Sequence, residues 1–213
     1  MNNLSRKLNS TSKKPLGPVN VFTRFINKNP KTSLTPVQTY PKISKTAFLS
    51  PYTSVVGNVT LSKNVFVDQH AAILADRGGP IFVGANTSIV TGAVLNGERK
   101  RTIGNKSYSI IIGKKTVIST GALVNGASIV GDGVVVGGNV YNSIIGDGCF
   151  IGANSTVRRV TIAPNRFVPH GAVVVTQKQA DSLRKVPSDF IALYKELYAT
   201  YQTLRAGYSR MYG

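Results

Sequence analysis

Residues 112–136 read IGKKTVISTGALVNGASIVGDGVVV, and this stretch repeats with a strict period of six residues. An aliphatic residue opens each step, and a small or aliphatic residue follows four positions later. The first set is Ile112, Ile118, Val124, Val130 and Val136, and the second is Thr116, Ala122, Ser128, Val134 and Val140. Helices repeat near 3.6 residues and strands near 2, so neither explains the pattern. A fixed six-residue period is typical of a hexapeptide β-helix, in which three hexads form one triangular coil around stacked aliphatic residues.

The period extends in both directions with interruptions. Further aliphatic anchors are Val56, Leu61, Val67, Ile73, Val83, Ile89, Leu95, Ile145, Ile151, Val157 and Ile162. The irregular steps from Val56 to Leu61 and from Val136 to Ile145 predict corners that bulge or are shortened. The sequence thus predicts an all-β solenoid, a parallel β-helix of roughly six to seven coils between residues 44 and 175. We expect replacement of Thr116 or Ser128 to cost much less stability than replacement of an anchor.

Length and composition fit one domain with appendages. The chain has 213 residues and 42% hydrophobic residues, with no run of 18 apolar residues that would predict a transmembrane helix. Cys149 is the only cysteine, and it lies four residues after the anchor Ile145. This small inward position predicts a buried packing thiol, and a single cysteine excludes a framework of disulfides within the chain.

The charge is strongly one-sided, because 26 Lys and Arg residues face 8 acidic residues, which gives a net charge of +18. The first acidic residue is Asp68. An acid-free basic leader resembles a mitochondrial targeting segment, although a basic solvated arm has the same composition. We therefore divide the chain into a basic arm at 1–43, the β-helix at 44–175 and a helical segment at 176–213.

Basic residues gather at two places on the predicted β-helix, a projecting loop and a corner. Residues 98–109 interrupt the six-residue rhythm, so we expect them to project as a loop. The basic contact candidates are Arg99, Lys100, Arg101 and Lys106 in this loop and Arg158 and Arg159 at a corner.

The segment after residue 176 leaves the repeat. Ser188 is a favourable helix start, and apolar residues follow it at steps of three and four up to Leu204. This stripe predicts a helix of about four turns that packs along a flat face of the β-helix.

The sequence resembles the gamma-class carbonic anhydrases and the related scaffold domain of carboxysomes. Matching segments are ILADRGGPIFVG at 73–84, SYSIIIG at 107–113, IGDGCFIGANSTV at 145–157 and VPHGAVVVTQKQADSL at 168–183. The resemblance implies a left-handed parallel β-helix, a trimer with parallel axes and a C-terminal α-helix packed along the coils.

That family holds zinc between adjacent subunits through three histidines, two of them five residues apart and the third one coil earlier. The resemblance places these slots at Asn96, Thr120 and Asn125, none of which is a good zinc ligand. Asn125 follows Asn96 by 29 residues, which fits one coil of 18 residues plus a loop of 11. The only histidines, His70 and His170, occupy no ligand slot, so we expect both to be corner or surface residues.

Other positions of the family's active site also differ. The resemblance aligns Leu74 with the arginine that orients bicarbonate and Val90 with a glutamine, whereas Asp76 keeps its carboxylate and is followed by Arg77. Glu98 lies one residue from the place of a proton-shuttling glutamate. Hydration of CO2 in this family requires a hydroxide on the metal. We therefore predict a pseudoenzyme with no catalytic residue, metal or cofactor.

Three classes of function remain open. The first is a catalytically silent structural subunit of a trimer, more readily a heterotrimer, in a membrane-associated respiratory assembly. We place this trimer on the matrix side of mitochondrial complex I, at the inner membrane. The second is a basic RNA-binding accessory protein of a mitochondrial ribosome, since neutralising phosphates is a main use of such charge. The third is an active hexapeptide-repeat enzyme, such as an acyltransferase with a histidine base.

Overall fold

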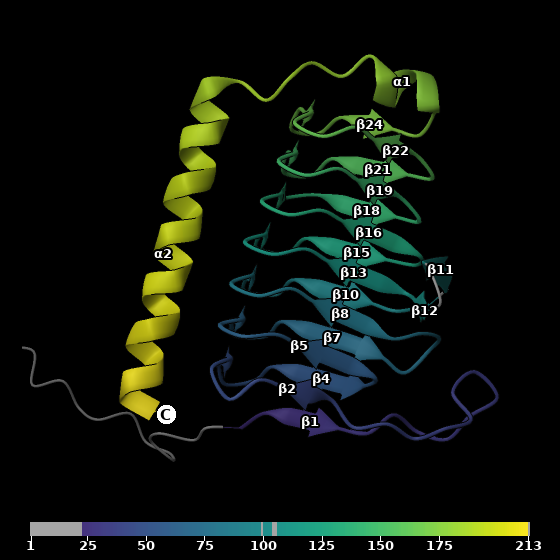
Figure 1. Ribbon diagram of the computed structural model, residues 1–213, viewed down its shortest axis with the longest axis vertical. Coiled ribbons are helices and arrows are strands. Elements are labelled where there is room, and N and C mark those ends of the chain that lie inside the picture. Colours follow the sequence, from purple (N-terminus) through teal and green to yellow (C-terminus); the bar gives the residue numbers. More distant parts are fainter. Residues whose placement is uncertain (1–22, 99, 104–105, 213) are drawn as a thin grey trace, which may run out of the picture.

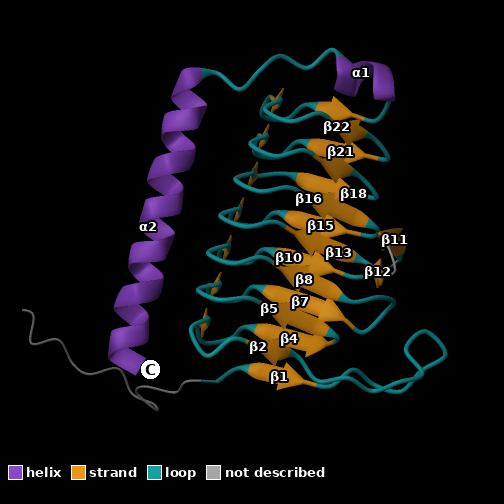
Figure 2. Ribbon diagram, in the orientation of Figure 1, coloured by secondary structure: helices purple, strands orange, loops and turns teal. Residues whose placement is uncertain are grey.

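The chain forms a parallel β-solenoid with a long helix beside it (Figures 1 and 2). The computed structural model describes residues 23–98, 100–103 and 106–212. Three parallel sheets of eight, seven and seven strands form the sides of the solenoid, which gives about seven coils. The predicted fold class and coil number are confirmed.

We name the sheets A, B and C. Sheet A contains β1 (Phe25–Asn27), β4 (Ser54–Gly57), β7 (Ala72–Ala75), β10 (Val94–Asn96), β15 (Leu123–Asn125), β18 (Asn139–Tyr141), β21 (Thr156–Arg158) and β24 (Val173–Val174). Sheet B contains β2 (Lys42–Ile43), β5 (Val59–Leu61), β8 (Ile81–Val83), β13 (Ile110–Ile112), β16 (Ser128–Val130), β19 (Ile144–Ile145) and β22 (Thr161–Ile162). Sheet C contains β3 (Phe48–Leu49), β6 (Phe66–Val67), β9 (Ser88–Ile89), β14 (Val117–Ile118), β17 (Val135–Val136), β20 (Phe150–Ile151) and β23 (Phe167–Val168).

Within the interruption at 98–109, β11 (Arg101–Ile103) and β12 (Lys106–Tyr108) pair antiparallel, on the side away from the long helix (Figure 1). The chain resumes the solenoid in register, because Asn96 on β10 lies opposite Asn125 on β15. The predicted loop of 11 residues between coils is therefore confirmed.

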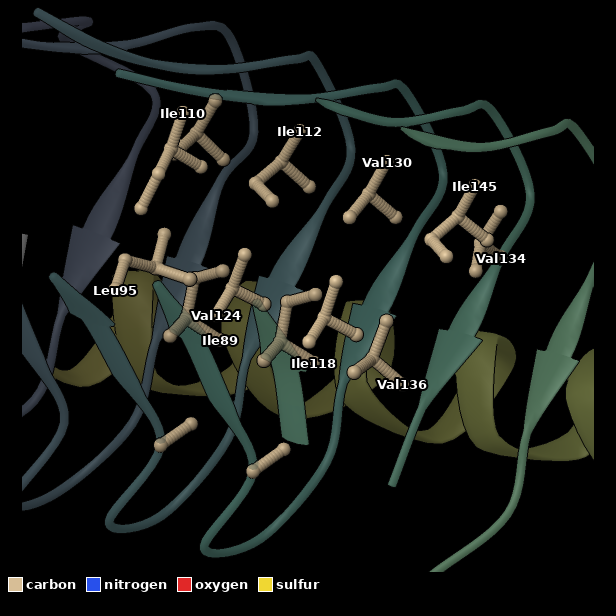
Figure 3. Packing of buried hydrophobic residues seen from close by; sticks show 14 of the residues in the cluster. Ile89, Leu95, Ile110, Ile112, Ile118, Val124, Val130, Val134, Val136 and Ile145 are labelled. Atoms are coloured by element: carbon tan, nitrogen blue, oxygen red, sulfur yellow. The ribbon is translucent and has the colours of Figure 1, made fainter. Parts of the chain in front are cut away.

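The aliphatic anchors stack in the interior (Figure 3). Ile112, Ile118, Val124, Val130 and Val136 all have 0% exposure. At about 25 cal/mol for each Å² of apolar surface buried, this continuous column is the main favourable contribution to folding. The predicted core is confirmed.

Two anchors were misplaced by the sequence pattern. Val55, and not Val56, lies opposite Ile73, so the first irregular step disappears because Val55 and Leu61 are six residues apart. Val140 lies opposite Val124 and is itself an anchor. The chain reaches it only four residues after Val136, because this corner is shortened.

The small positions contribute hydrogen bonds as well as volume. Thr116 donates from Oγ1 to the carbonyl of Gly131 at 2.8 Å and accepts from the amide of Val134 at 3.2 Å. Ser128 donates to the carbonyl of Asn125 at 2.7 Å. These hydroxyls satisfy backbone groups at corners where the sheets cannot pair them.

The long helix α2 (Ser188–Tyr212) has 25 residues, about seven turns and not the four predicted. It runs beside the solenoid along its length (Figure 1), and its aromatic rings contact sheet C. Near one end of the solenoid, the ring centroids of Phe190 and Phe167 are 4.4 Å apart, and near the other end those of Tyr208 and Phe48 are 5.6 Å apart. Among the described residues, no helix combines the length and apolarity needed to cross a bilayer.

Both ends of the solenoid are built from segments outside the repeat. The helix α1 (Gln177–Asp181) lies over the last coil, where the Gln177 side chain accepts from the amide of Thr161 at 3.0 Å and donates to its carbonyl at 2.8 Å. The chain at residues 184–186 pairs antiparallel with the strand end at residues 165–167.

At the other end, β1 and β2 precede residue 44, so the solenoid begins within the segment predicted to be a separate arm. Buried Asn29 ties a loop together through the carbonyl of Val37 and the amide of Thr39. The part of the arm at residues 1–22 lies outside the described residues.

Candidate functional site at the outer edge of sheet A

The degenerate metal slots lie in one outward-facing row of sheet A. The strand register places Leu74, Asn96, Asn125, Tyr141 and Arg158 opposite one another on successive coils. Side chains alternate along a strand, so these residues point away from the anchors that precede them in the chain. The structure thus brings Leu74, Asn96 and Asn125 together, as the resemblance implied.

Asn96 and Glu98 are linked at the start of this row. The Asn96 Nδ2 atom donates to Glu98 Oε1 at 3.1 Å, and the same carboxylate lies 3.9 Å from Arg77 Nη1. Arg77 thus pairs with Glu98, and no ion pair joins it to the adjacent Asp76 among the described residues.

Three buried oxygens at this edge have no hydrogen-bond partner among the described residues: Asp76 Oδ1, Asn96 Oδ1 and Asn125 Oδ1. A buried polar atom without a partner costs about 1–3 kcal/mol, so three of them on one face mark a surface that a donor should cover.

The residues at the three slots do not fit zinc. Asn96 and Asn125 offer neutral amide oxygens, whereas protein zinc is held by thiolate, imidazole or carboxylate groups. Thr120 is exposed at the corner before β15, and Val90 is buried at the equivalent corner of the preceding coil. No group of three or more His, Cys, Asp or Glu side chains that could hold a metal occurs within the described part of the chain.

Both histidines lie at the corner between sheets C and A, on other coils than Thr120. His70 has a left-handed backbone with φ of 59° and stacks on Tyr52 at 5.3 Å. His170 accepts a hydrogen bond at Nδ1 from the amide of Ala153 at 2.8 Å, which orients its ring against the next coil. These contacts give each ring a packing role.

Cys149 is in the core, as predicted, with 1% exposure. Its sulfur accepts from the amide of Arg166 at 3.4 Å, so it takes the place of the corner hydroxyls seen in other coils. Burial raises the pKa of the thiol above its ordinary value of 9.0, which disfavours the reactive thiolate.

A cavity of about 460 Å³ opens next to Asn125, further along the same row. Its lining residues are the acidic Glu98 and the polar or basic Asn125, Tyr141, Asn142, Thr156, Arg158 and Arg159. Sequence reasoning found the two arginines but missed Tyr141, Asn142 and Thr156. The sequence predicts an irregular corner after Val136 but not whether it bulges or is shortened, so the register that places Tyr141 beside Asn125 could not be assigned.

The remaining basic candidates are only partly described. Arg99 lies outside the described residues, and Lys106 is placed as part of β12 without an account of its side chain. Lys100 is exposed, and Arg101 on β11 is half-buried. Neither of them lines the cavity beside Arg158.

Comparison with known proteins gives several relatives of clear similarity, including the following two. Over 172 residues the chain is 34% identical to the carboxysome assembly protein CcmM of Nostoc sp., a match that covers 78% of this chain and 31% of that protein. Over 164 residues it is 33% identical to a carbonic anhydrase of Methanosarcina thermophila, covering 70% of this chain and 66% of the relative. The chain thus matches under a third of the length of the first relative.

A solved structure of an acetyltransferase-like protein from Bacillus cereus has the same fold, with a TM-score of 0.56. It is 16% identical, and the match covers 88% of this chain and 98% of that one. No protein-family profile matches the chain.

Proposed function

Because this chain belongs to the gamma-class carbonic anhydrase family of hexapeptide-repeat proteins, we propose that it is a catalytically silent structural subunit of a trimer. The observation that carries the proposal is the pair of asparagines that lie side by side at two of the family's metal slots. Amide groups at these slots can hydrogen-bond across a subunit seam but cannot replace imidazole in holding zinc.

Unsatisfied groups support a seam at this edge of sheet A. The buried Oδ1 atoms of Asn96 and Asn125 lack donors within the chain, and hydrogen bonds from a neighbouring subunit would remove that cost. A neighbouring family member would present the exposed corner hydroxyl of its Thr120 position to these asparagines. This arrangement needs no metal.

A second face supports lateral association. An outward row of sheet B that consists of Phe82, Ile111, Ile129 and Ile144 runs across four successive coils and is partly exposed. The helix α2 packs on sheet C and leaves this row uncovered. A contiguous apolar row of this kind is a normal feature of a protein interface.

We further propose that the subunits of the trimer are unlike, because a charge of +18 on each of three identical chains would repel strongly. The assembly we favour is the gamma-carbonic-anhydrase-like trimer on the matrix side of mitochondrial complex I. The acid-free basic leader and the loss of the histidine ligands both support this placement.

The test is the mass of the native assembly after exhaustive chelation, combined with metal analysis and a CO2 hydration assay. We expect a trimer that survives chelation, no zinc held by Asn96, Thr120 and Asn125, and no hydration activity from this chain alone. A monomer would refute the structural role, three identical copies would remove its heteromeric part, and one zinc at these three residues would overturn the silent assignment.

A further inference from the structure

We propose that the cavity lined by Tyr141, Asn142, Thr156, Arg158 and Arg159 binds a small phosphate monoester. This site adjoins the degenerate metal slot at Asn125, which also lines it, and the proposal does not depend on the trimer. The cavity volume of about 460 Å³ falls within the range of small-molecule sites, about 300–1,000 Å³, and exceeds the space that a single water or chloride requires.

The charge of the cavity fits an anion. The only ion pair within the described residues joins Arg77 to Glu98, so neither Arg158 nor Arg159 has a carboxylate partner there. The one acid that lines the cavity, Glu98, is already engaged by Arg77 and by the side-chain amide of Asn96. Two unpaired guanidinium groups therefore stand in a cavity whose carboxylate is compensated.

Two guanidinium groups match a phosphate dianion better than a carboxylate, which carries one charge. A phosphate monoester has a charge of about −1.5 to −2 at neutral pH and three terminal oxygens. Guanidinium groups present their N–H donors in a fork that pairs with two such oxygens at once. The side chains of Tyr141, Asn142 and Thr156 add polar groups of the kind that orient the rest of a small ligand.

The backbone at this corner provides a useful variant. Arg159 has a left-handed conformation with φ of 57°, and the equivalent corner of the preceding coil has Asn142 with φ of 49°. Asparagine adopts this conformation more readily than arginine does. Arg159→Asn therefore removes a guanidinium group without straining the corner, and Arg158→Gln changes an exposed side chain at the end of β21.

The experiment is calorimetric titration of the full chain, in the assembly as purified, with inorganic phosphate and with glycerol phosphate at constant ionic strength. We expect both ligands to bind, chloride not to compete, and the double variant Arg158→Gln, Arg159→Asn to weaken phosphate binding at least tenfold. The matched control Arg210→Gln removes an exposed arginine from the far end of α2 and should leave phosphate binding unchanged. The melting temperatures of both variants without ligand confirm that they fold.

Three results would overturn the proposal. The first is phosphate binding no stronger than chloride binding at the same ionic strength. The second is an equal loss of affinity in Arg210→Gln, which would mean that the net charge, and not the cavity, attracts the anion. The third is binding of a single-stranded RNA oligonucleotide through the two arginines with no binding of the monoester, which would assign the surface to a polyanion.

Discussion

Ser128→Ala tests whether the small corner positions stabilise the solenoid through hydrogen bonds. Ser128 is 1% exposed, and its hydroxyl donates to the Asn125 carbonyl at 2.7 Å and accepts from the Ser143 amide at 3.3 Å. The Asn125 carbonyl keeps a second donor, the amide of Asn142 at 3.2 Å. Removing the hydroxyl therefore leaves mainly the Ser143 N–H without its partner.

One unsatisfied buried donor costs about 1–3 kcal/mol. For a chain of this size each kcal/mol lowers the melting temperature by about 2–4 °C, so Ser128→Ala should melt roughly 2–12 °C lower. Thermal unfolding followed by circular dichroism gives the value. The matched control is Ser119→Ala at a partly exposed corner, which we expect to stay within about 0.5 kcal/mol of the parent. Indistinguishable melting of the two variants would show that the corner hydroxyls contribute only volume.

Three further predictions concern the core and the helix. Ile118→Ala should cost about 2–5 kcal/mol in thermal melts, because it leaves a cavity in a column with 0% exposure, and a loss below that of Ser128→Ala would contradict the register. Phe190→Ala should cost about 2 kcal/mol of stability, less than the loss of a fully buried phenylalanine, because the Phe190 ring is half-buried. It should also speed proteolysis of α2. Unchanged proteolysis would mean that the ring contacts with Phe167 and Phe150, at centroid distances of 4.4 Å and 4.8 Å, do not hold the helix. The raised pKa of the Cys149 thiol predicts a stability contribution that is constant below pH 9 and falls as the pH rises above it, because the thiol ionises first in the unfolded chain. The difference in unfolding free energy between the parent and Cys149→Ser should therefore change above pH 9. A constant difference up to pH 11 would refute the assignment.

The sequence predicted the parts of the fold that follow the period. An inward aliphatic residue every six positions leaves little freedom, so the core between Ile112 and Val136 could be assigned residue by residue. The spacing of 29 residues also placed Asn96 beside Asn125, because a loop inserted between coils does not change the register on either side.

The sequence could not predict features that depend on local chain length or on tertiary contacts. The corner after Val136 is shortened, and nothing in the pattern shows that Val140 replaces the expected anchor until its partner Val124 is known. The partner of Arg77 depends on where Glu98 emerges after β10, which no periodicity specifies. The strand β1 lies in a segment without hexads, and its sheet partner is β4.

The termination of the last coil has a consequence for how this protein can aggregate. A parallel stack of strands exposes unpaired N–H and C=O groups at its end, and such an end is a template on which a second molecule can continue the stack into a fibril. Here the Gln177 side chain hydrogen-bonds to the N–H and C=O of Thr161 as a neighbouring strand would. Residues 184–186 pair in the same way with residues 165–167 at the end of sheet C. A single amide side chain and one short segment thus cap the last strands of sheets B and C, which disfavours end-to-end growth of these two sheets at this pole.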